Sequence, residues 1–243
     1  MKLPWTPLRG DSWQWLARWR EPREFATLLG VLLCAAGLWA FVELSDEVLE
    51  GDTQAVDRAI LLSLRNADDL SDPLGPKWLE EMGRDFTALG GVGVLTFITL
   101  ASGGFLMLEG KWRAAGFVLI SIAGAIAVSL LLKLGFARPR PELVPHGAYV
   151  YTSSFPSGHA MMSAASYLTL GALLARLHRP WRLKAYFLLL AVALTLTVGV
   201  SRVYLGVHWP TDVLAGWTLG ACWALLCWLA ASHLQRRGEM ESS

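Results

Sequence analysis

Three short clusters of charged residues, histidines and prolines lie at the edges of long apolar runs. They are Lys133-Leu-Gly-Phe-Ala-Arg138-Pro139-Arg140-Pro141, then Pro156-Ser157-Gly158-His159, then Ser201-Arg202 with His208 and Asp212. Cations can hold a phosphoryl group while one imidazole attacks phosphorus and a second protonates the leaving oxygen. The combined inventory therefore predicts phosphoryl-transfer chemistry.

The second cluster precedes an apolar run of helical length. Ser157 is a favoured N-cap residue, and the N–H groups of a helix start bind anions. Gly158 would let an oxyanion approach the main chain, and His159 would stand in the first helical turn beside it. Taken alone, the cluster is equally compatible with a capped helix that has no other role.

The third cluster pairs a histidine with a carboxylate. Pro210 suits the first turn of a helix, so His208 would stand just before that helix and Asp212 in its first turns. The spacing would let Asp212 reach one ring nitrogen of His208, which leaves the other nitrogen as a nucleophile. The alternative is a pair that only satisfies two polar groups at a membrane boundary.

Four cations lie at the outer ends of the third and fifth apolar runs: Lys133, Arg138, Arg140 and Arg202. Long basic side chains can snorkel to lipid phosphates, which is the simpler explanation. Arginine also matches the oxygens of a bound phosphoryl group, and prolines 139 and 141 restrict this stretch. The coincidence of all three clusters favours the phosphoryl-binding interpretation.

The composition indicates a membrane protein. Of 243 residues, 54% are hydrophobic and only 17% are charged, against about 25% in a typical soluble domain. The net charge of +1 gives no reason to expect a nucleic-acid partner. The cysteines lie within apolar runs without metal-type spacing and are expected to be buried: Cys34, Cys222 and Cys227.

We expect an all-α fold, a polytopic bundle of six transmembrane helices with amphipathic interfacial helices, in one membrane-embedded domain over residues 1–243. The expected spans are 25–44, 87–108, 114–133, 158–175, 185–204 and 212–231. Residues 1–24 are rich in Trp and Arg and are expected at the membrane interface, whereas 233–243 form a polar tail.

The long polar segment 45–86 is predicted to lie on the membrane surface. Val56, Ile60 and Leu64 recur every four residues, which indicates an amphipathic helix, and a short helix is expected over 77–82. The acidic side chains of this segment are expected to form a solvated face. They do not form a compact set of metal ligands.

Basic residues predict the orientation. The turns 109–113 and 176–184 are basic, so these turns and both termini are expected in the cytoplasm. The three clusters would then face the extracytoplasmic side. His146 is expected to be a solvated residue of the active-face loop, whereas His178 and His233 would lie far from the chemistry.

The three clusters resemble the tripartite signature of the type-2 phosphatidic acid phosphatases, whose wider superfamily includes the vanadium-dependent haloperoxidases. The resemblance rests on Lys133 with Arg140-Pro141, on Pro156-Ser157-Gly158-His159, and on Ser201-Arg202 with His208 and Asp212. All motifs match in order and spacing. The signature spans residues 133–212 and leaves the segments 1–24 and 45–86 uncovered.

The resemblance implies a role for each motif residue. His208 would form a phosphohistidine, Asp212 would orient His208, and His159 would protonate the leaving oxygen. The phosphate oxygens would be held by Lys133, Arg140, Arg202, Ser157 and the Gly158 amide. Arg138 and Ser201 would give support, and members of this family type need no metal or other cofactor.

The sequence therefore predicts a lipid phosphatase of a bacterial inner membrane with its site facing the exterior. Candidate substrates are undecaprenyl pyrophosphate, which the outward-facing site favours, phosphatidylglycerophosphate and phosphatidic acid. The alternatives are a lipid phosphotransferase, a lipid A phosphatase, a non-catalytic lipid-phosphate transporter or binding protein, a haloperoxidase-like oxidase and a purely structural protein. The substrate and the oligomeric state stay open.

Overall fold

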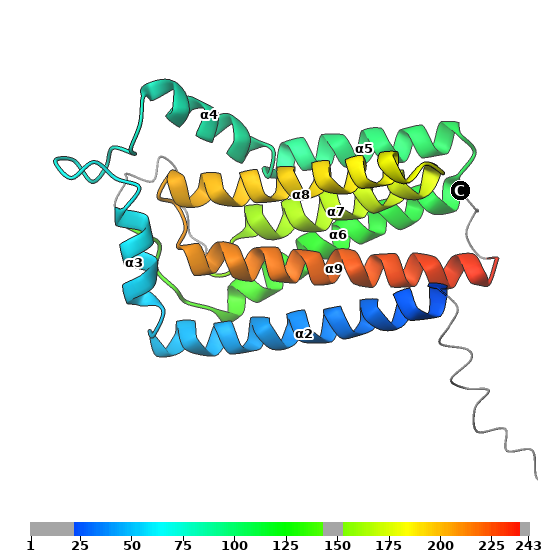
Figure 1. Cartoon of the computed structure of the whole chain (residues 1–243), viewed down its shortest axis with the longest axis horizontal. Helices are drawn as coiled ribbons and strands as arrows, with labels where there is room; N and C mark the ends of the chain where they lie inside the picture. The colour runs from blue at the N-terminus through cyan, green and yellow to red at the C-terminus, as the bar shows by residue number, and fades with distance from the viewer. Residues whose placement is uncertain (1–21, 143–152, 239–243) are drawn as a thin grey trace, which may run out of the picture.

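The computed structural model describes residues 22–142 and 153–238, and these ranges form eight α-helices without a β-strand. The helices are α2 (Pro22–Glu50), α3 (Gln54–Leu62), α4 (Lys77–Ala88), α5 (Val92–Leu108), α6 (Trp112–Gly135), α7 (Gly158–Leu177), α8 (Trp181–Tyr204) and α9 (Pro210–Arg236). Figure 1 shows the long helices side by side, with α3 across one end of the bundle. The all-α prediction is confirmed.

Five of these helices are long and apolar enough to cross a membrane: α2, α6, α7, α8 and α9. Helices α4 and α5 meet at a bend of 50° and make a sixth span if they are counted together. The expected span 87–108 is therefore divided: α4 runs to Ala88 instead of ending at residue 82, and α5 starts at Val92. The chain turns at Gly90, where a Cβ would lie only 3.2 Å from the carbonyl oxygen of His159.

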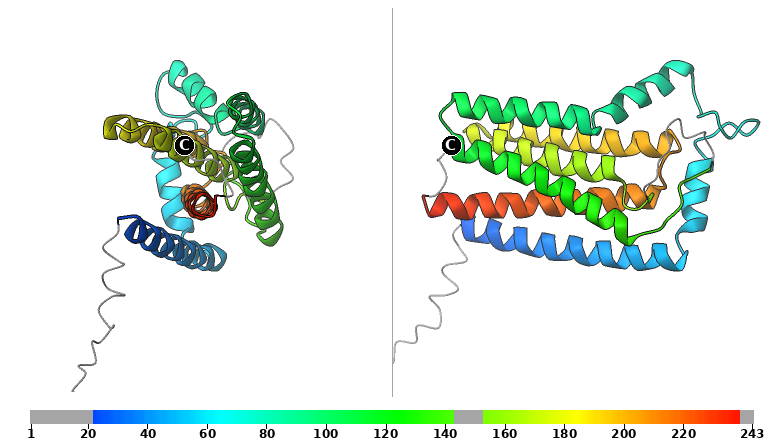
Figure 2. Two further views of the ribbon diagram at one scale, coloured as in Figure 1. Left: turned by 90° about the vertical axis from the view of Figure 1, so that its right-hand side faces the viewer. Right: turned by 180° about the vertical axis from the view of Figure 1, so that it is seen from behind.

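Helix α7 is the centre of the bundle. In its most apolar stretch, 67% of the residues are buried inside the bundle, whereas in the corresponding stretch of α2 only 17% are buried. Gly216 and Gly220 on α9 face the α7 backbone, and a Cβ at Gly216 would lie 2.7 Å from the carbonyl oxygen of Ser157. Close packing of small residues is a common device in membrane helices. The end-on view in Figure 2 shows α2 on the outside of the bundle, beside α9.

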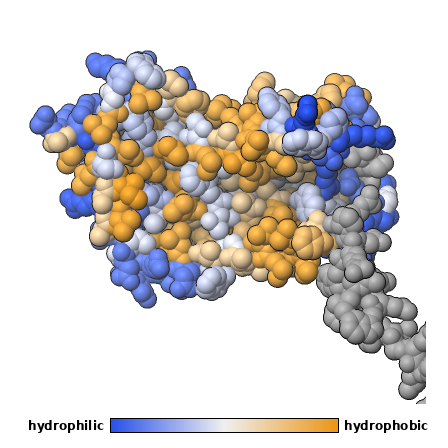
Figure 3. Space-filling model, in the orientation of Figure 1, coloured by the Kyte–Doolittle hydropathy of each residue, from blue (hydrophilic) through white to orange (hydrophobic). Residues whose placement is uncertain are grey.

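The surface has the pattern of a membrane protein. Figure 3 shows a broad hydrophobic band over the middle of the bundle and hydrophilic residues gathered at its two ends. Large apolar side chains are exposed on α5, α6 and α8, among them Phe97, Ile120 and Leu189. The buried cysteines, Cys34, Cys222 and Cys227, lie within the bundle and are not disulfide-bonded.

The polar segment after the first span differs from its prediction. Helix α2 continues to Glu50, so this segment starts later than residue 45. On α3, Val56 and Ile60 are 60% and 43% exposed, whereas Asp57 is completely buried. The expectation of a solvated acidic face was wrong at Asp57, because α3 lies across the bundle end and turns this carboxylate toward Arg138.

The two ends of the bundle separate the motifs from the basic turns. The three clusters lie at the end that α3 crosses, whereas the α5–α6 turn, the α7–α8 turn and the C-terminal end of α9 lie at the other (Figure 1). His178 and His233 belong to this second end, as predicted. Residues 1–21 and the loop residue His146 lie outside the described part of the chain.

Candidate active site

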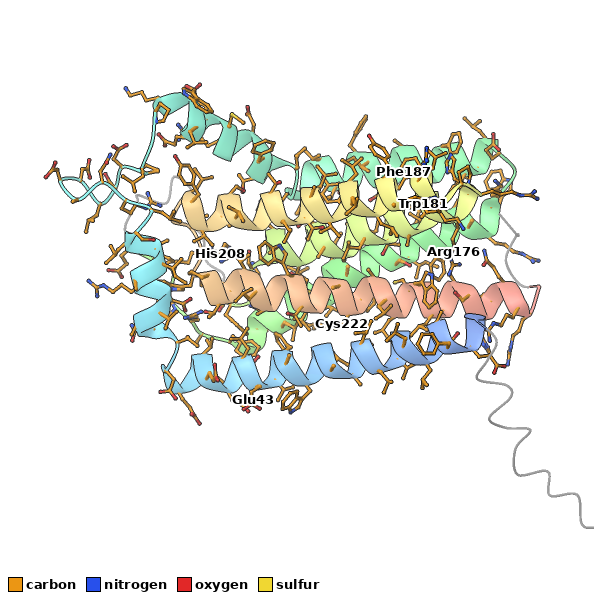
Figure 4. All side chains as sticks on the ribbon, in the orientation of Figure 1. Glu43, Arg176, Trp181, Phe187, His208 and Cys222 are labelled. Atoms are coloured by element: carbon orange, nitrogen blue, oxygen red, sulfur yellow. The ribbon has the colours of Figure 1, made fainter. Side chains whose placement is uncertain are left out.

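Four helix ends meet at one end of the bundle and carry the motif residues. Lys133 is in the last turn of α6 and Arg202 in the last turn of α8. His159 and Asp212 are in the first turns of α7 and α9. Because these four helices all have one end here, segments far apart in the sequence lie close together. Figure 4 labels His208 at this end of the bundle.

His208 lies between α8 and α9 and is 1% exposed. Its Nδ1 is 3.3 Å from Oδ2 of Asp212, the pairing that the four-residue spacing predicts. The same Oδ2 accepts the backbone N–H of Trp209 at 2.9 Å, and Pro210 starts the helix. The carboxylate is thus fixed by the start of α9 and fixes the imidazole in turn.

The second ring nitrogen of His208 faces a cation. Nη1 of Arg140 is 3.0 Å from Nε2 and also donates to the carbonyl oxygen of Val207 at 3.0 Å. An arginine can only donate, so Nε2 presents its lone pair and Nδ1 carries the proton. Desolvation by burial lowers the pKa of His208 to about 4, against the raising effect of Asp212. His208 is therefore neutral at neutral pH, as a nucleophile requires.

The start of α7 has hydrogen-bond donors that lack a partner among the described residues. Ser157 occupies the N-cap position, but its hydroxyl makes no capping bond and is buried without a hydrogen-bond partner among the described residues. Its backbone N–H donates to the carbonyl oxygen of Asp212 at 2.9 Å, which joins α7 to α9. A Cβ at Gly158 would lie 3.3 Å from Nζ of Lys133, so the glycine lets the ammonium group approach the helix start.

Arg140 and Arg202, the two remaining phosphate-binding candidates, have hydrogen-bond partners for only some of their N–H groups in the described part of the chain. Nη1 of Arg202 donates to the hydroxyl of Thr87 at 3.0 Å, a contact that the sequence did not suggest. The Nε atoms of Arg140 and Arg202 are buried without a partner in the described part of the chain. Buried donors of this kind indicate a site for an acceptor such as a phosphate oxygen.

His159 faces the same group of cations. It is half-buried on α7, and the charges of Arg202, Lys133 and Arg140 act on it, as does His208. Gly90 packs against its backbone from the α4–α5 break. The structure thus brings the second histidine into the electrostatic environment of the first.

The two predicted supporting residues have different positions. Nη1 of Arg138 is 2.6 Å from Oδ1 of Asp212, and Nη2 is 2.6 Å from Oδ2 of Asp57, so this arginine lies behind the nucleophile. The hydroxyl of Ser201 instead donates to the carbonyl oxygen of Val198 in its own helix at 2.6 Å. In the described part of the chain, this hydroxyl makes no hydrogen bond to another motif residue.

The sequence did not predict two further contacts of the site. The hydroxyl of Ser154 donates to Oδ2 of Asp212 and lies 3.3 Å from Nδ1 of His208, although it precedes the second cluster in a loop. Asp57 enters from α3, 81 residues before Arg138 and 154 residues before Thr211. Neither residue stands at a spacing that predicts the contact. In the described ranges, no group of three His, Cys, Asp or Glu side chains could hold a metal ion.

A model of the PAP2 superfamily matches residues 114–236, which include all three clusters. The chain belongs to the PAP2 superfamily. The match covers α6 to α9 almost completely and leaves α2 to α5 outside it. The family match therefore falls on the part of the chain that carries the three motifs.

Individual relatives agree with this assignment. Phosphatidylglycerophosphatase B of Bacillus subtilis is 33% identical over 147 residues, which are 59% of this chain and 70% of the relative. Undecaprenyl-diphosphatase of Sulfolobus acidocaldarius is 34% identical over 122 residues, 48% of this chain and 55% of the relative. A Bacillus subtilis crystal structure, described as a transmembrane PAP2-type phosphatidylglycerolphosphate phosphatase, has a TM-score of 0.72 and 27% identity. The superposition covers 84% of this chain and 98% of that one. The chain is a multi-pass membrane protein of the PAP2 superfamily.

Proposed function

We propose that this PAP2 protein is a lipid phosphatase that works through a phosphohistidine on His208. The observation that carries the proposal is the state of this imidazole: buried, neutral, held at Nδ1 by Asp212 and offered at Nε2 toward Arg140. A binding protein or transporter would need the cations but not an oriented nucleophile. The geometry therefore favours turnover over binding alone.

The mechanism has two displacements at phosphorus. The lone pair of Nε2 attacks phosphorus, the bond from phosphorus to the lipid-side oxygen breaks, and His159 gives that oxygen a proton. A water molecule then attacks phosphorus, gives a proton to His159, and releases inorganic phosphate as the P–N bond breaks. The Nδ1–H of His208 donates its hydrogen bond to Asp212 throughout, and the carboxylate stabilises the positive charge that develops on the ring.

The transferred group would be held by the open donors around His208. Lys133, Arg140 and Arg202 supply charge, and the buried hydroxyl of Ser157 supplies a neutral donor. The amide of Gly158 lies in the first turn of α7, where backbone N–H groups lack intrahelical acceptors. No step of this mechanism calls for a metal ion.

The substrate class is a membrane lipid with a terminal phosphate or pyrophosphate. The named relatives act on phosphatidylglycerophosphate and undecaprenyl diphosphate, and a further relative is a lipid A 1-phosphatase of Rhizobium etli. The site lies where helices α6 to α9 leave the hydrophobic band, so the headgroup would reach it while the lipid tails stay between helices. An extracytoplasmic site favours a recycled polyprenyl pyrophosphate among these candidates.

Phosphate release by the purified protein tests the function. The panel consists of undecaprenyl pyrophosphate, phosphatidylglycerophosphate, phosphatidic acid and a water-soluble phosphate ester, all with EDTA and beside a His208→Ala protein. We expect release from at least one lipid, resistance to EDTA and loss of activity in the variant. Activity that His208→Ala retains would place the nucleophile elsewhere, and a lipid product seen only with an added acceptor would indicate a phosphotransferase.

The orientation can be tested separately. We propose that the clusters face the exterior of the inner membrane and that both termini are cytoplasmic, because the basic turns lie at the opposite end of the bundle. Single cysteines at Asp52 and Lys111, in a background that lacks the three native cysteines, can be labelled with an impermeant maleimide in intact cells. Labelling at position 52 alone supports the proposal, and labelling at position 111 alone reverses it.

A further inference from the structure

Asp57 is a buried carboxylate that the three motifs do not include. It belongs to α3, outside the residues that the PAP2 model matches. Its exposed fraction is 0%. A carboxylate is costly to bury unless its charge is paired and its oxygens are hydrogen-bonded, so its contacts should explain why it is there.

The contacts of Asp57 lead directly to the nucleophile. Oδ2 is 2.6 Å from Nη2 of Arg138, whose Nη1 is 2.6 Å from Oδ1 of Asp212. Asp57 also accepts the N–H of Thr211 on Oδ1 at 3.0 Å and the hydroxyl of Thr211 on Oδ2 at 2.6 Å. It thus holds both the arginine beside Asp212 and the residue directly before Asp212 in the chain.

Helix α3 is also fixed at its other end. Arg65, shortly after α3, is buried and donates through Nη2 to the carbonyl oxygen of Tyr204 at 2.9 Å. Tyr204 is the last residue of α8, so this contact fixes the start of the loop that carries His208. Asp57 is therefore attached at the start of α9 and Arg65 at the end of α8, on the two sides of the nucleophile.

The charges explain why a second carboxylate is useful. Arg138 alone would neutralise Asp212 and weaken its effect on His208. With Asp57 included, one positive and two negative charges leave a net negative charge behind the imidazole. Attack by Nε2 places positive charge on the ring, and a net negative partner stabilises that charge in a buried site.

We propose that Asp57 is a positioning residue for His208: it orients Arg138 and Thr211 and balances the charge of Arg138, so that Asp212 acts on His208 as an anion. The inference rests on the proposed function. It assigns part of the catalytic arrangement to α3, in the polar segment after the first span. A purely structural Asp57 would anchor α3 without affecting the chemistry of the imidazole.

A set of charge-changing variants separates these roles. We would measure kcat and KM for Asp57→Asn, Arg138→Gln and the double variant, on the panel lipid that the wild type cleaves fastest. Asp57→Asn should lower kcat by about tenfold or more while KM stays within about threefold, because the loss is in the transition state. The double variant removes one charge of each sign and should recover kcat above both single variants.

Controls keep the result interpretable. Asp52→Asn changes an exposed carboxylate just before α3 and should leave kcat unchanged. Size-exclusion profiles and thermal unfolding of each variant in detergent separate loss of fold from loss of chemistry. If Asp57→Asn does not yield monodisperse protein, the double variant is compared with Arg138→Gln, and a higher kcat in the double variant supports charge balance.

Two outcomes would overturn the inference alone. One is a folded Asp57→Asn protein with wild-type kcat, and the other is a folded double variant whose kcat does not exceed that of either single variant. A wild-type protein that is inactive on every lipid would instead overturn the proposed function, and the inference with it.

Discussion

Arg140 donates a hydrogen bond to Nε2 of His208, with 3.0 Å between the two nitrogens. In the free protein the guanidinium therefore covers the nitrogen that would attack phosphorus. A phosphate oxygen is a stronger acceptor than a neutral imidazole, so substrate binding should draw the guanidinium toward phosphate and release the lone pair. The same contact fixes the tautomer that Asp212 requires at Nδ1.

The acid limb of the pH profile should lie well below the ordinary range of histidine. Burial lowers the pKa of His208 to about 4, and this residue must be neutral to attack. The rate kcat/KM, which reports the free enzyme, should therefore persist as pH falls through about 6.5 and be lost near 4. The measurement is kcat/KM against pH in detergent micelles.

The substrate phosphate also titrates, so its own ionisation in the same micelles must be followed by ³¹P NMR. A limb near 6.5 that the substrate does not explain would contradict a buried neutral His208. A profile that stays flat below pH 4, with chemistry shown to limit the rate, would contradict the assignment of His208 as the nucleophile.

Ser157→Ala should lower activity without lowering stability. Its hydroxyl is buried without a partner in the described structure, and a hydrogen bond to a charged phosphate contributes about 1.5–3 kcal/mol. We therefore expect a loss of roughly 10–100-fold in kcat/KM and an unchanged or higher unfolding temperature. Steady-state kinetics and thermal unfolding of the same preparation provide the two measurements.

Ser166 gives a matched control for this variant. It lies further along the same helix, and its hydroxyl is also buried without a partner. Ser166→Ala should likewise leave the unfolding temperature unchanged or raise it, and it should leave kcat/KM unchanged. Equal activity losses in the two variants would mean that the hydroxyl of Ser157 has no special role toward phosphate.

Arg202→Ala should remove a large part of the transition-state stabilisation. The Nε of Arg202 is buried without a partner among the described residues, and its Nη1 donates to the hydroxyl of Thr87 at 3.0 Å. Removing one preorganised donor typically costs about 10²–10³-fold in kcat. The exposed Arg84, which pairs with Glu80 one turn away, supplies the control as Arg84→Ala. A near-normal kcat for Arg202→Ala would remove this residue from the phosphate site.

Gly216→Ala should displace the start of α7. The added Cβ would lie 2.7 Å from the carbonyl oxygen of Ser157 and 3.0 Å from the amide of Met161, and backbone atoms cannot move away cheaply. We expect about 1–3 kcal/mol of destabilisation, as for overpacking, together with lower activity. Unfolding in detergent and phosphate release give the two values.

Gly104→Ala is the corresponding control on α5, because a Cβ there meets nothing within 4 Å. Alanine is the better helix former by up to about 1 kcal/mol, so this variant should be as stable as the wild type or more so. Destabilisation of the two variants to the same extent would show that close α7–α9 contact does not explain the need for Gly216.

Long apolar runs could be recognised from sequence because the bilayer imposes a minimum length on a spanning helix. Helices α6 to α9 accordingly start and end close to their predicted bounds. The α4–α5 break was missed because residues 87–108 read as one apolar run. What divides them is the packing of Gly90 against His159, a contact between residues far apart in the chain.

The sequence by itself determined the membrane class, the three motifs and their common end of the bundle, because helix length, local capping and motif spacing are properties of neighbouring residues. It also determined that Asp212 can reach His208, since four residues separate them. Only the tertiary structure decided what lies behind that pair. The contacts of Arg138, Ser154 and Asp57 depend on how helices pack, and no local pattern distinguishes a solvated Asp57 from one that faces the catalytic loop.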